Sequence, residues 1–312
     1  MLDIDFIREN KEKVQEAVVE KKLSQEVDID EILKLDKLYR EQLQLVESKR
    51  ALRNQLSENI GQVEDQNARE KLIKEASAVK EDLKKLEPEL EEYHQKLNGL
   101  LFKLPNVIHS DVPKGEDEDD NVVAKTVGKK PQLSFIPKDH MELGEALDLI
   151  DTEISAKVSG ARFNYLKNEA VLLQFALVKF VMDTLTDPET ITRIADEVGN
   201  PSAKTFIPVV PPAIVRGEVA KKMARLEPVE DRYYLSDEDL MFAGSAEHTL
   251  GPMFMDETFE EDELPLRFIG YSTAFRREAG SYGKDTQGIL RRHQFDKLEM
   301  ESFTTAENGL VE

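Results

Sequence analysis

The 312-residue sequence contains no cysteine, which excludes disulfide bonds and thiolate zinc sites. Its five histidines are scattered without the paired spacing of metal ligands, so we do not expect a zinc enzyme. No apolar run approaches the roughly 20 residues that a membrane-spanning helix needs. The N-terminal stretch MLDIDFIREN is acidic, unlike a signal peptide. We therefore expect a soluble, cytoplasmic protein without a membrane segment.

A positive net charge is also lacking, because the formal charge at pH 7 is −21. This argues against a protein that wraps nucleic acid nonspecifically, since neutralising phosphates needs a basic surface. Two segments are neutral: residues 29–60 carry six basic and six acidic side chains, and residues 69–104 carry eight of each. A polyanion would most readily touch these two segments, although charge alone favours ordinary solvated helices.

Apolar side chains recur in steps of four and three between residues 79 and 104, which indicates the heptad repeat of a coiled coil. The predicted seam comprises Val79, Leu83, Leu86, Leu90, Tyr93, Leu97, Leu100 and Leu104. An earlier segment repeats the pattern with two polar members, at Leu35, Leu38, Gln42, Leu45, Lys49, Leu52 and Leu56. Because a short polar stretch, 61–67, separates them, the two helices should fold back as an antiparallel hairpin. Pro88 lies off the seam, where it would kink the second helix.

Prolines, a glycine and the acidic run 116–120 mark a connector after the second helix. We predict a helical domain over residues 1–104, a linker over 105–120 and a mixed α and β domain over 121–312. In the latter, residues 169–185 have the apolar density of a buried helix. Residues 206–210 are typical of a strand that runs into two prolines.

A long antiparallel β-hairpin is predicted from strands at 266–275 and 289–300 around the loop AGSYGKDTQG. Strand alternation places one set of side chains of the second strand on a common face: Arg291, His293, Phe295, Lys297 and Glu299. Arginines donate to phosphates or carboxylates, an aromatic ring stacks on a base, and carboxylates accept from hydroxyl or amino groups. The face suits a nucleotide with a small polar substrate, while periodicity alone equally allows a solvated, ion-paired surface.

The string FRREAGSYGKDTQGILRRHQFDKLEM, residues 275–300, resembles motif 2 of the class II aminoacyl-tRNA synthetases in the form particular to the seryl-tRNA synthetase family. The resemblance extends to MLDIDFIREN, the helical hairpin, PNVIHSDVPKGEDEDDNVV, HMELGEALDLID, AKVSGARFNYLKNEAVLL and a motif 1 candidate around FIPVVPP. It implies an α+β protein whose two-helix arm reaches the long variable arm of serine tRNA. A class II catalytic domain on an antiparallel sheet would follow, with a dimer interface near Pro211 and Pro212.

The resemblance also implies an ATP site. Arg276 would contact the α-phosphate, and Glu278 would contact the adenine amino group, with Arg277 beside them. Arg291 would reach the outer phosphates, and Phe295 would stack on the adenine. Arg276 and Arg291, together with Mg²⁺, would stabilise phosphate charge during catalysis.

For the amino acid, the resemblance assigns the substrate carboxylate to Arg276 and the substrate hydroxyl to Glu299. The family's Thr-Ala-Glu, which contacts the substrate serine, is replaced here by Ser245, Ala246 and Glu247. Because serine retains the hydroxyl, we expect the change to be tolerated. The implied reaction is activation of serine by ATP and transfer of seryl to tRNA(Ser), with tRNA(Sec) as a further candidate.

Only twelve residues follow Met300, whereas the family continues to motif 3, which carries an arginine beyond the adenine and an acidic metal ligand. We therefore expect a chain truncated before motif 3, without a metal ligand of its own, and a homodimer when full length. One alternative is a noncatalytic relative that binds tRNA or a partner synthetase. Another is a coiled-coil interaction protein with an inactive domain.

Overall fold

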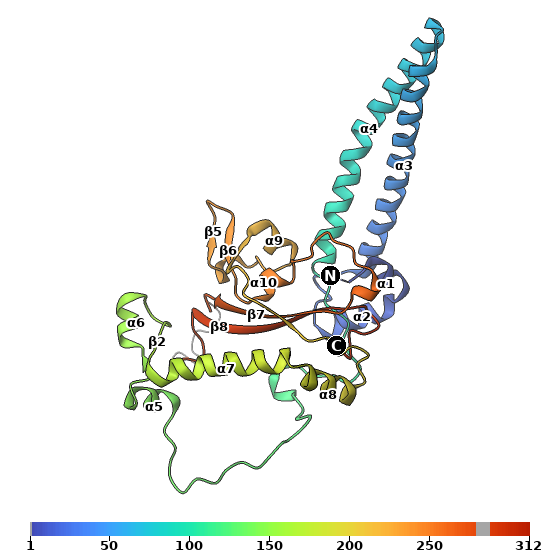
Figure 1. The fold of residues 1–312 in the computed structure, drawn as a ribbon. Coiled ribbons are helices and arrows are strands. Elements are labelled where there is room, and N and C mark those ends of the chain that lie inside the picture. Colours follow the sequence, from blue (N-terminus) through green and yellow to red (C-terminus); the bar gives the residue numbers. More distant parts are fainter. Residues whose placement is uncertain (1, 279–287) are drawn as a thin grey trace. The chain divides into compact units, whose positions relative to one another are not determined.

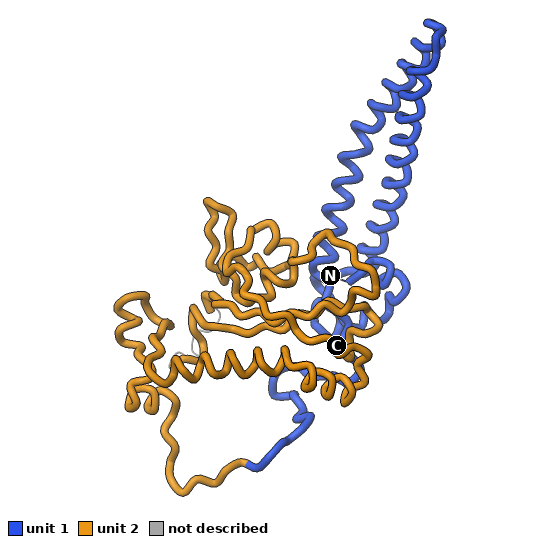
Figure 2. Tube along the Cα trace, in the orientation of Figure 1, with its two compact units in different colours: residues 1–129 blue, residues 130–312 orange. Residues whose placement is uncertain are grey.

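The computed structural model describes residues 2–278 and 288–312. The chain forms two compact units, residues 1–129 and 130–312 (Figure 2). No described helix is long and apolar enough to cross a membrane. The predicted domain limits after Leu104 and Asp120 remain predictions.

The first unit is helical, with α1 at Ile4–Glu9, α2 at Lys11–Glu20, α3 at Ile29–Gln62 and α4 at Gln66–Leu101 (Figure 1). Asp3, Asp28 and Asp65 cap α1, α3 and α4 by accepting hydrogen bonds from backbone N–H groups of the first turn. At the base of the hairpin, α1 and α2 pack against α3 and α4 in one core, which contains Ile7, Val14, Val18, Ile29, Ile32, Leu97 and Leu101.

The predicted hairpin of two long helices is confirmed, and the α4 seam is buried or half-buried throughout. On α3 the predicted seam is wrong at two positions, because Leu38 and Leu45 are 37% and 41% exposed. The neighbouring residues take their places: Tyr39 stacks on His94 with ring centroids 5.5 Å apart, and Val46 is fully buried. Apolar residues occupy both candidate registers, so spacing alone did not distinguish them.

The two polar seam residues of α3 find partners on α4. Gln42 donates to the carbonyl of Leu86 at 3.2 Å and to Glu89 at 3.1 Å, and Lys49 donates to Asp82 at 2.6 Å. Pro88 lies within α4 without ending it.

The second unit contains both helices and strands. It also has two short 3₁₀ helices, at Val229–Asp231 and at Glu261–Glu263. Its helices are α5 His140–Ala146, α6 Glu153–Val158, α7 Asn168–Thr186, α8 Pro188–Val198, α9 Gly217–Lys222 and α10 Glu247–Leu250. Its strands are β1 Ile150–Asp151, β2 Tyr165–Leu166, β3 Ile207–Val209, β4 Ile214–Arg216, β5 Tyr234–Leu235, β6 Leu240–Phe242, β7 Leu266–Phe275 and β8 Gln294–Phe303.

Strands β3, β7 and β8 form the central sheet in that order. The antiparallel pairing of β7 with β8 confirms the predicted β-hairpin, with Leu266 opposite Phe303 and Phe275 opposite Gln294. The second strand begins at Gln294 rather than at residue 289, so Arg291 precedes it. Strand β3 joins β7 in parallel.

Helix α7 lies along one face of this sheet and α10 packs on the other (Figure 1). Val181, Met182 and Leu185 of α7 pack against Ile269 and Leu298. The expectation that residues 169–185 form a buried helix is wrong in its burial, because no residue of α7 is buried. One side of the helix meets the sheet, and the opposite side carries exposed apolar residues such as Leu172 and Phe180.

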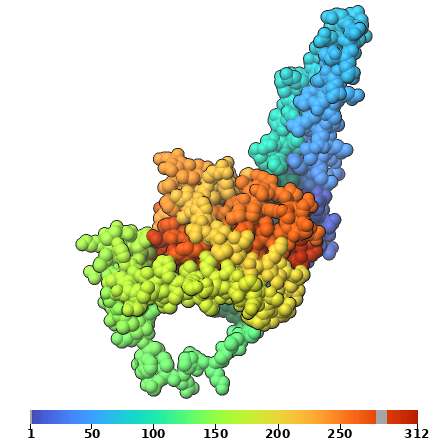
Figure 3. All heavy atoms as spheres, viewed as in Figure 1, coloured from blue at the N-terminus to red at the C-terminus, as the bar shows by residue number. Residues whose placement is uncertain are grey.

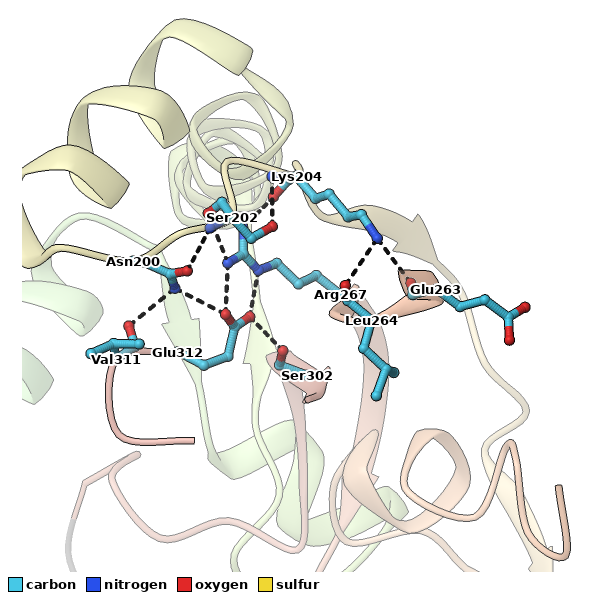
Figure 4. A network of polar contacts seen from close by, with 9 residues as sticks. All are labelled: Asn200, Ser202, Lys204, Glu263, Leu264, Arg267, Ser302, Val311 and Glu312. Carbon is cyan, nitrogen blue, oxygen red and sulfur yellow. Dashed lines mark hydrogen bonds and ion pairs between the residues drawn. The ribbon is translucent and has the colours of Figure 1, made fainter. Parts of the chain in front are cut away.

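After β8 the chain folds back against β7 through a buried ion pair (Figure 4). Glu312 accepts from the Arg267 guanidinium, from Ser302 and from Asn200. The hydrogen bonds from Arg267 hold the pKa of Glu312 down at about 2. Arg267 also donates to the Ser202 carbonyl, so it joins three separate segments at the end of the sheet.

Candidate active site

Alternate side chains of β8 face α10. Phe295, Lys297 and Glu299 are half-buried on this face, as strand alternation predicted for them. Asp296 faces the other way, where it accepts hydrogen bonds from Tyr271 at 3.0 Å and Gln174 at 2.7 Å. The strand thus separates one polar set on the α10 side from another on the α7 side.

Glu299 lies at the centre of the α10-side set. It accepts a hydrogen bond from the Ser245 hydroxyl and forms an ion pair with Lys297. The Lys297 ammonium also lies 3.1 Å from Ser245 Oγ. Burial would raise the pKa of Glu299, but the hydrogen bonds from Lys297 and Ser245 and the charges of Lys297 and Arg276 lower it below its usual range. Glu299 is therefore a carboxylate, and an acceptor only, at neutral pH.

Arg276 and Phe295 form one wall of the site. The Arg276 guanidinium lies 5.3 Å from the centroid of the Phe295 ring, within cation–π range. Its Nε donates to the carbonyl of Gly244 at 3.0 Å, and its backbone N–H donates to the carbonyl of His293 at 2.9 Å. Arg276 is thereby held at both its side chain and its backbone.

The loop that receives Arg276 is fixed from behind by a buried histidine. His248 Nδ1 accepts a hydrogen bond from the backbone N–H of Gly244 at 3.1 Å. Burial, together with the smaller effects of the charges of Arg225, Arg232 and Arg276, lowers the pKa of His248 to about 4 against the opposing effect of Glu247. The ring is therefore neutral at pH 7 and keeps Nδ1 available as an acceptor.

Gly270 allows α10 to approach the sheet. It lies opposite Glu299 in the β7–β8 register. A Cβ at this position would lie 2.5 Å from Leu250 Cδ1 and 3.1 Å from Ala246 Cβ. A larger residue would force the Leu250 side chain to move and would press on Ala246, the neighbour of Ser245.

The remaining two residues of the Ser-Ala-Glu triplet differ in environment. Ala246 is fully buried and packs with Leu250 and Phe268, so it lies in the core. Glu247 Oε1 accepts hydrogen bonds from Arg225 at 2.6 Å and 3.1 Å. This arginine comes from the segment after α9 and was not among the predicted site residues.

The other predicted ATP residues form two groups. Arg291 and Glu278 form an ion pair at 3.5 Å. Arg277 is directed elsewhere, with its guanidinium 5.7 Å from the Tyr233 ring centroid and 3.4 Å from the Glu230 carbonyl. The structure therefore brings Arg291 to Glu278 but places Arg277 against a different segment.

Several contributors to the site were missed in the sequence. Strand alternation had already placed Lys297 on the correct face, so its contact with Glu299 could have been expected. Arg225, His248 and Arg162 lack such a signal, because they reach the site only through the folding of distant segments. The predicted loop AGSYGKDTQG covers residues 279–288, of which all but Gly288 lie outside the described residues. Within the described ranges, no three or more His, Asp or Glu side chains gather as a possible metal site.

Comparison with known proteins identifies the family. Residues 1–108 match the seryl-tRNA synthetase N-terminal domain, and residues 229–312 match the tRNA synthetase class II core domain (G, H, P, S and T). The serine–tRNA ligase of Methanosphaera stadtmanae is 34% identical over 313 residues, which cover 100% of this chain and 70% of the relative. The chain belongs to the serine–tRNA ligase family. The enzyme of Dictyoglomus turgidum, another member, is 39% identical over 303 residues, covering 96% of this chain and 67% of that protein.

Solved serine–tRNA ligase structures agree with this assignment. The seryl-tRNA synthetase of Pyrococcus horikoshii, complexed with ATP, superposes with a TM-score of 0.74 at 36% identity, over 96% of this chain and 69% of that one. The cytoplasmic enzyme of Naegleria fowleri, in complex with AMP, gives 0.71 at 25% identity, over 98% and 67% of the two chains. The predicted fold class and the predicted aminoacyl-tRNA ligase function are confirmed, and a coiled-coil interaction protein is disfavoured.

Proposed function

We propose that this member of the family binds serine and ATP on the α10-facing side of β8 and joins them as seryl-adenylate. The observation that carries the proposal is the meeting of Ser245, Lys297 and Glu299 beside Arg276 and Phe295. A hydroxyl acceptor, a cation for anionic groups and an aromatic ring lie on one sheet face. These are the groups that a small hydroxy amino acid and a nucleotide require.

In the proposed serine site, Glu299 accepts the hydrogen bond of the substrate hydroxyl. A carboxylate has two oxygens, so Glu299 can serve the substrate while it still accepts from Ser245. Arg276 binds the substrate carboxylate. Glu247, held by Arg225, supplies negative charge for the substrate ammonium. Ala246 supports these residues from the core.

In the proposed ATP site, the adenine stacks on Phe295 and its amino group meets Glu278. Arg276 binds the α-phosphate and Arg291 the outer phosphates, exchanging its ion pair with Glu278 for the stronger charge of the phosphates. The ATP complex of the Pyrococcus horikoshii relative supports ATP as the nucleotide.

Mg²⁺ is part of the proposal as a companion of ATP. Magnesium commonly binds substrate phosphates with one or two carboxylates instead of an all-protein cage. Bound Mg²⁺ would neutralise phosphate charge, while the chain's own arginines orient the two substrates.

The reaction needs positioning more than side-chain chemistry. A serine carboxylate oxygen attacks the α-phosphorus, a P–O bond forms, and the bond to pyrophosphate breaks. Because the proposal gives Arg276 both the substrate carboxylate and the α-phosphate, its guanidinium can align the reacting groups and stabilise the charge that develops between them. The seryl group then passes from the adenylate to the tRNA terminus, and AMP leaves.

The tRNA partner is assigned to the α3–α4 arm. We infer binding of tRNA(Ser), with tRNA(Sec) as a second candidate, in the cytoplasm. The match of residues 1–108 to the family's N-terminal domain supports this, as does the neutral charge of both helices in an acidic chain.

A homodimer is also proposed, through the uncovered side of α7. Leu172 and Phe180 of α7 are 69% and 67% exposed, and Figure 3 shows α7 along the surface of the visible face. Exposed apolar residues of this size on one helix favour a protein partner. The predicted interface near Pro211 and Pro212 directly follows Val210, another apolar residue, which is 79% exposed.

The test of the proposed function is serine-dependent exchange of pyrophosphate into ATP by the complete enzyme. We expect exchange with serine and near-background exchange with alanine. Charging of tRNA(Ser) should follow in the same preparation. Exchange that does not depend on serine would overturn the proposal.

A further inference from the structure

Arg162 contacts two segments of the proposed nucleotide site, although it lies 116 residues before Glu278 in the sequence. It lies in the loop between α6 and β2. Its Nη1 donates to the carbonyl of Glu278 at 2.8 Å, and its own carbonyl accepts from the backbone N–H of His293 at 3.1 Å. One residue therefore bridges the segment that follows β7 and the segment that precedes β8.

The backbone of Glu278 needs such support. Its φ is +51°, in the left-handed region that residues other than glycine, asparagine and aspartate rarely adopt. A conformation of this kind persists only where the surroundings hold it. The hydrogen bond from Arg162 to the Glu278 carbonyl is a direct contact of that type.

The loop that carries Arg162 is itself anchored. Its neighbour Phe163 offers a carbonyl that accepts from Ser155 Oγ at 2.7 Å and from Arg292 at 3.1 Å. Ser155 is 1% exposed and Arg292 is 8% exposed. The Phe163 ring also lies 5.2 Å from that of His293. Arg162 thus projects from a rigid base.

Different arginines contact the backbone and the side chain of Glu278. Arg162 contacts the carbonyl, while Arg291 lies 3.5 Å from the carboxylate, whose side chain is only 17% exposed. If Arg291 turns to the phosphates of ATP, as proposed above, the bond to Arg162 is unaffected because it involves main-chain oxygen. It can therefore keep the Glu278 carboxylate in place during binding.

We propose that Arg162 is a positioning residue for recognition of the adenine amino group, acting through Glu278. The inference deepens the proposed function and rests on the role of Glu278 in it. Arg162 touches no substrate in this scheme. Without it, the Glu278 backbone would relax towards negative φ and turn its carboxylate away from the base.

The test compares ATP with purine riboside triphosphate, which lacks the amino group, in the pyrophosphate exchange of the complete enzyme. In Arg162→Ala we expect KM for ATP to rise ~10-fold, as for loss of one well-placed hydrogen bond to the base, with little change in kcat. The KM for purine riboside triphosphate should be nearly unchanged. Arg162→Lys, which retains a donor, should recover part of the preference for ATP.

Two further variants separate the possible failures. Glu278→Ala should abolish the preference for ATP over purine riboside triphosphate. If this variant keeps that preference, the proposed role of Glu278 is refuted. Loss of the preference in Glu278→Ala with full retention in Arg162→Ala would refute the Arg162 inference alone. An equal rise of both KM values in Arg162→Ala would also refute it, since it indicates general distortion. Arg193→Ala on α8, which removes an exposed ion pair with Glu197, is the control and should match the parent.

Discussion

The molecule contains two long hairpins, the helical pair α3–α4 and the strand pair β7–β8, which differ in what completes them. Beyond the core at its base, the α3–α4 arm is held by contacts between its own two helices, as where Lys49 meets Asp82 and Val46 lies in one core cluster with Leu83. In β7–β8 the functional face is completed from outside, by Ser245 and Arg162. A local repeat is therefore enough to build the arm, whereas the candidate active site needs the whole second unit.

The largest effect expected from this comparison is the separation of the two activities. Residues 43–85 can be replaced by a short glycine linker, which leaves the core at the base of the arm intact. Charging of tRNA(Ser) should then fall to background, while serine-dependent pyrophosphate exchange persists. Aminoacylation and exchange assays on the same preparation measure both. Unchanged charging would remove the arm from tRNA recognition.

The second expected effect concerns the completed face of β8. Glu299→Ala should erode the preference for serine over alanine by about 10²-fold or more, because sites built around a substrate hydroxyl can discriminate by about 10⁴ to 10⁵. The measurement is kcat/KM for both amino acids in pyrophosphate exchange. Glu301→Gln, one repeat further along the same face, is the matched control. Equal discrimination in Glu299→Ala and parent would contradict the assignment.

The third effect is a pH dependence of stability caused by His248, which supports the Gly244 loop. Since the pKa of folded His248 is about 4, below the usual 6.5, the folded state binds fewer protons than the unfolded state between these values. The neutral His248 ring therefore contributes to the free energy of unfolding in full above pH 6.5. This contribution, about 3 kcal/mol in total, is lost as the pH falls to about 4.

Denaturant unfolding of the second unit at pH 7 and pH 5 measures this loss. His248→Asn keeps an acceptor for the Gly244 N–H but does not titrate, so its stability should change less over the same interval. The same slope in both proteins would assign the pH dependence to other groups.

The smallest effect tests the register of the arm. Val46→Ala should cost about 2 kcal/mol, because Val46 is fully buried against α4. Leu45→Ala should cost less than about 0.5 kcal/mol, since Leu45 is 41% exposed. Helical circular dichroism during denaturant unfolding gives both values. A larger cost for Leu45→Ala than for Val46→Ala would indicate that the arm follows the predicted seam through Leu38 and Leu45.

Much of the fold was predictable because its signals are local. The seam of α4, the hairpin of α3 and α4, and the alternation of Phe295, Lys297 and Glu299 all follow from the period of a helix or a strand. The start of β8 was predicted five residues early. Periodicity continued through Arg291 and His293, although the backbone there does not pair as a strand.

Residues of the candidate site were predictable only where the family motif named them and the segment carrying them directs their side chains into the site. Resemblance to the family named Ser245 and Glu299, and the structure brings them into one hydrogen bond. Nothing local in the sequence marks Gly270, although its missing side chain is what lets α10 approach the sheet. Arg277 shows the converse, since its place in the motif did not bring it to the other ATP residues.

The sequence by itself determined the helical arm, the β-hairpin and the family, because periodic patterns and contiguous motifs are properties of neighbouring residues. Only the tertiary structure decided that Val46 rather than Leu45 enters the seam, that His248 is neutral behind Gly244, and that Arg162 holds Glu278. Burial and hydrogen bonding between distant segments depend on how the chain packs. No local pattern encodes which of two adjacent apolar residues, or which arginine, will meet a partner that far along the chain.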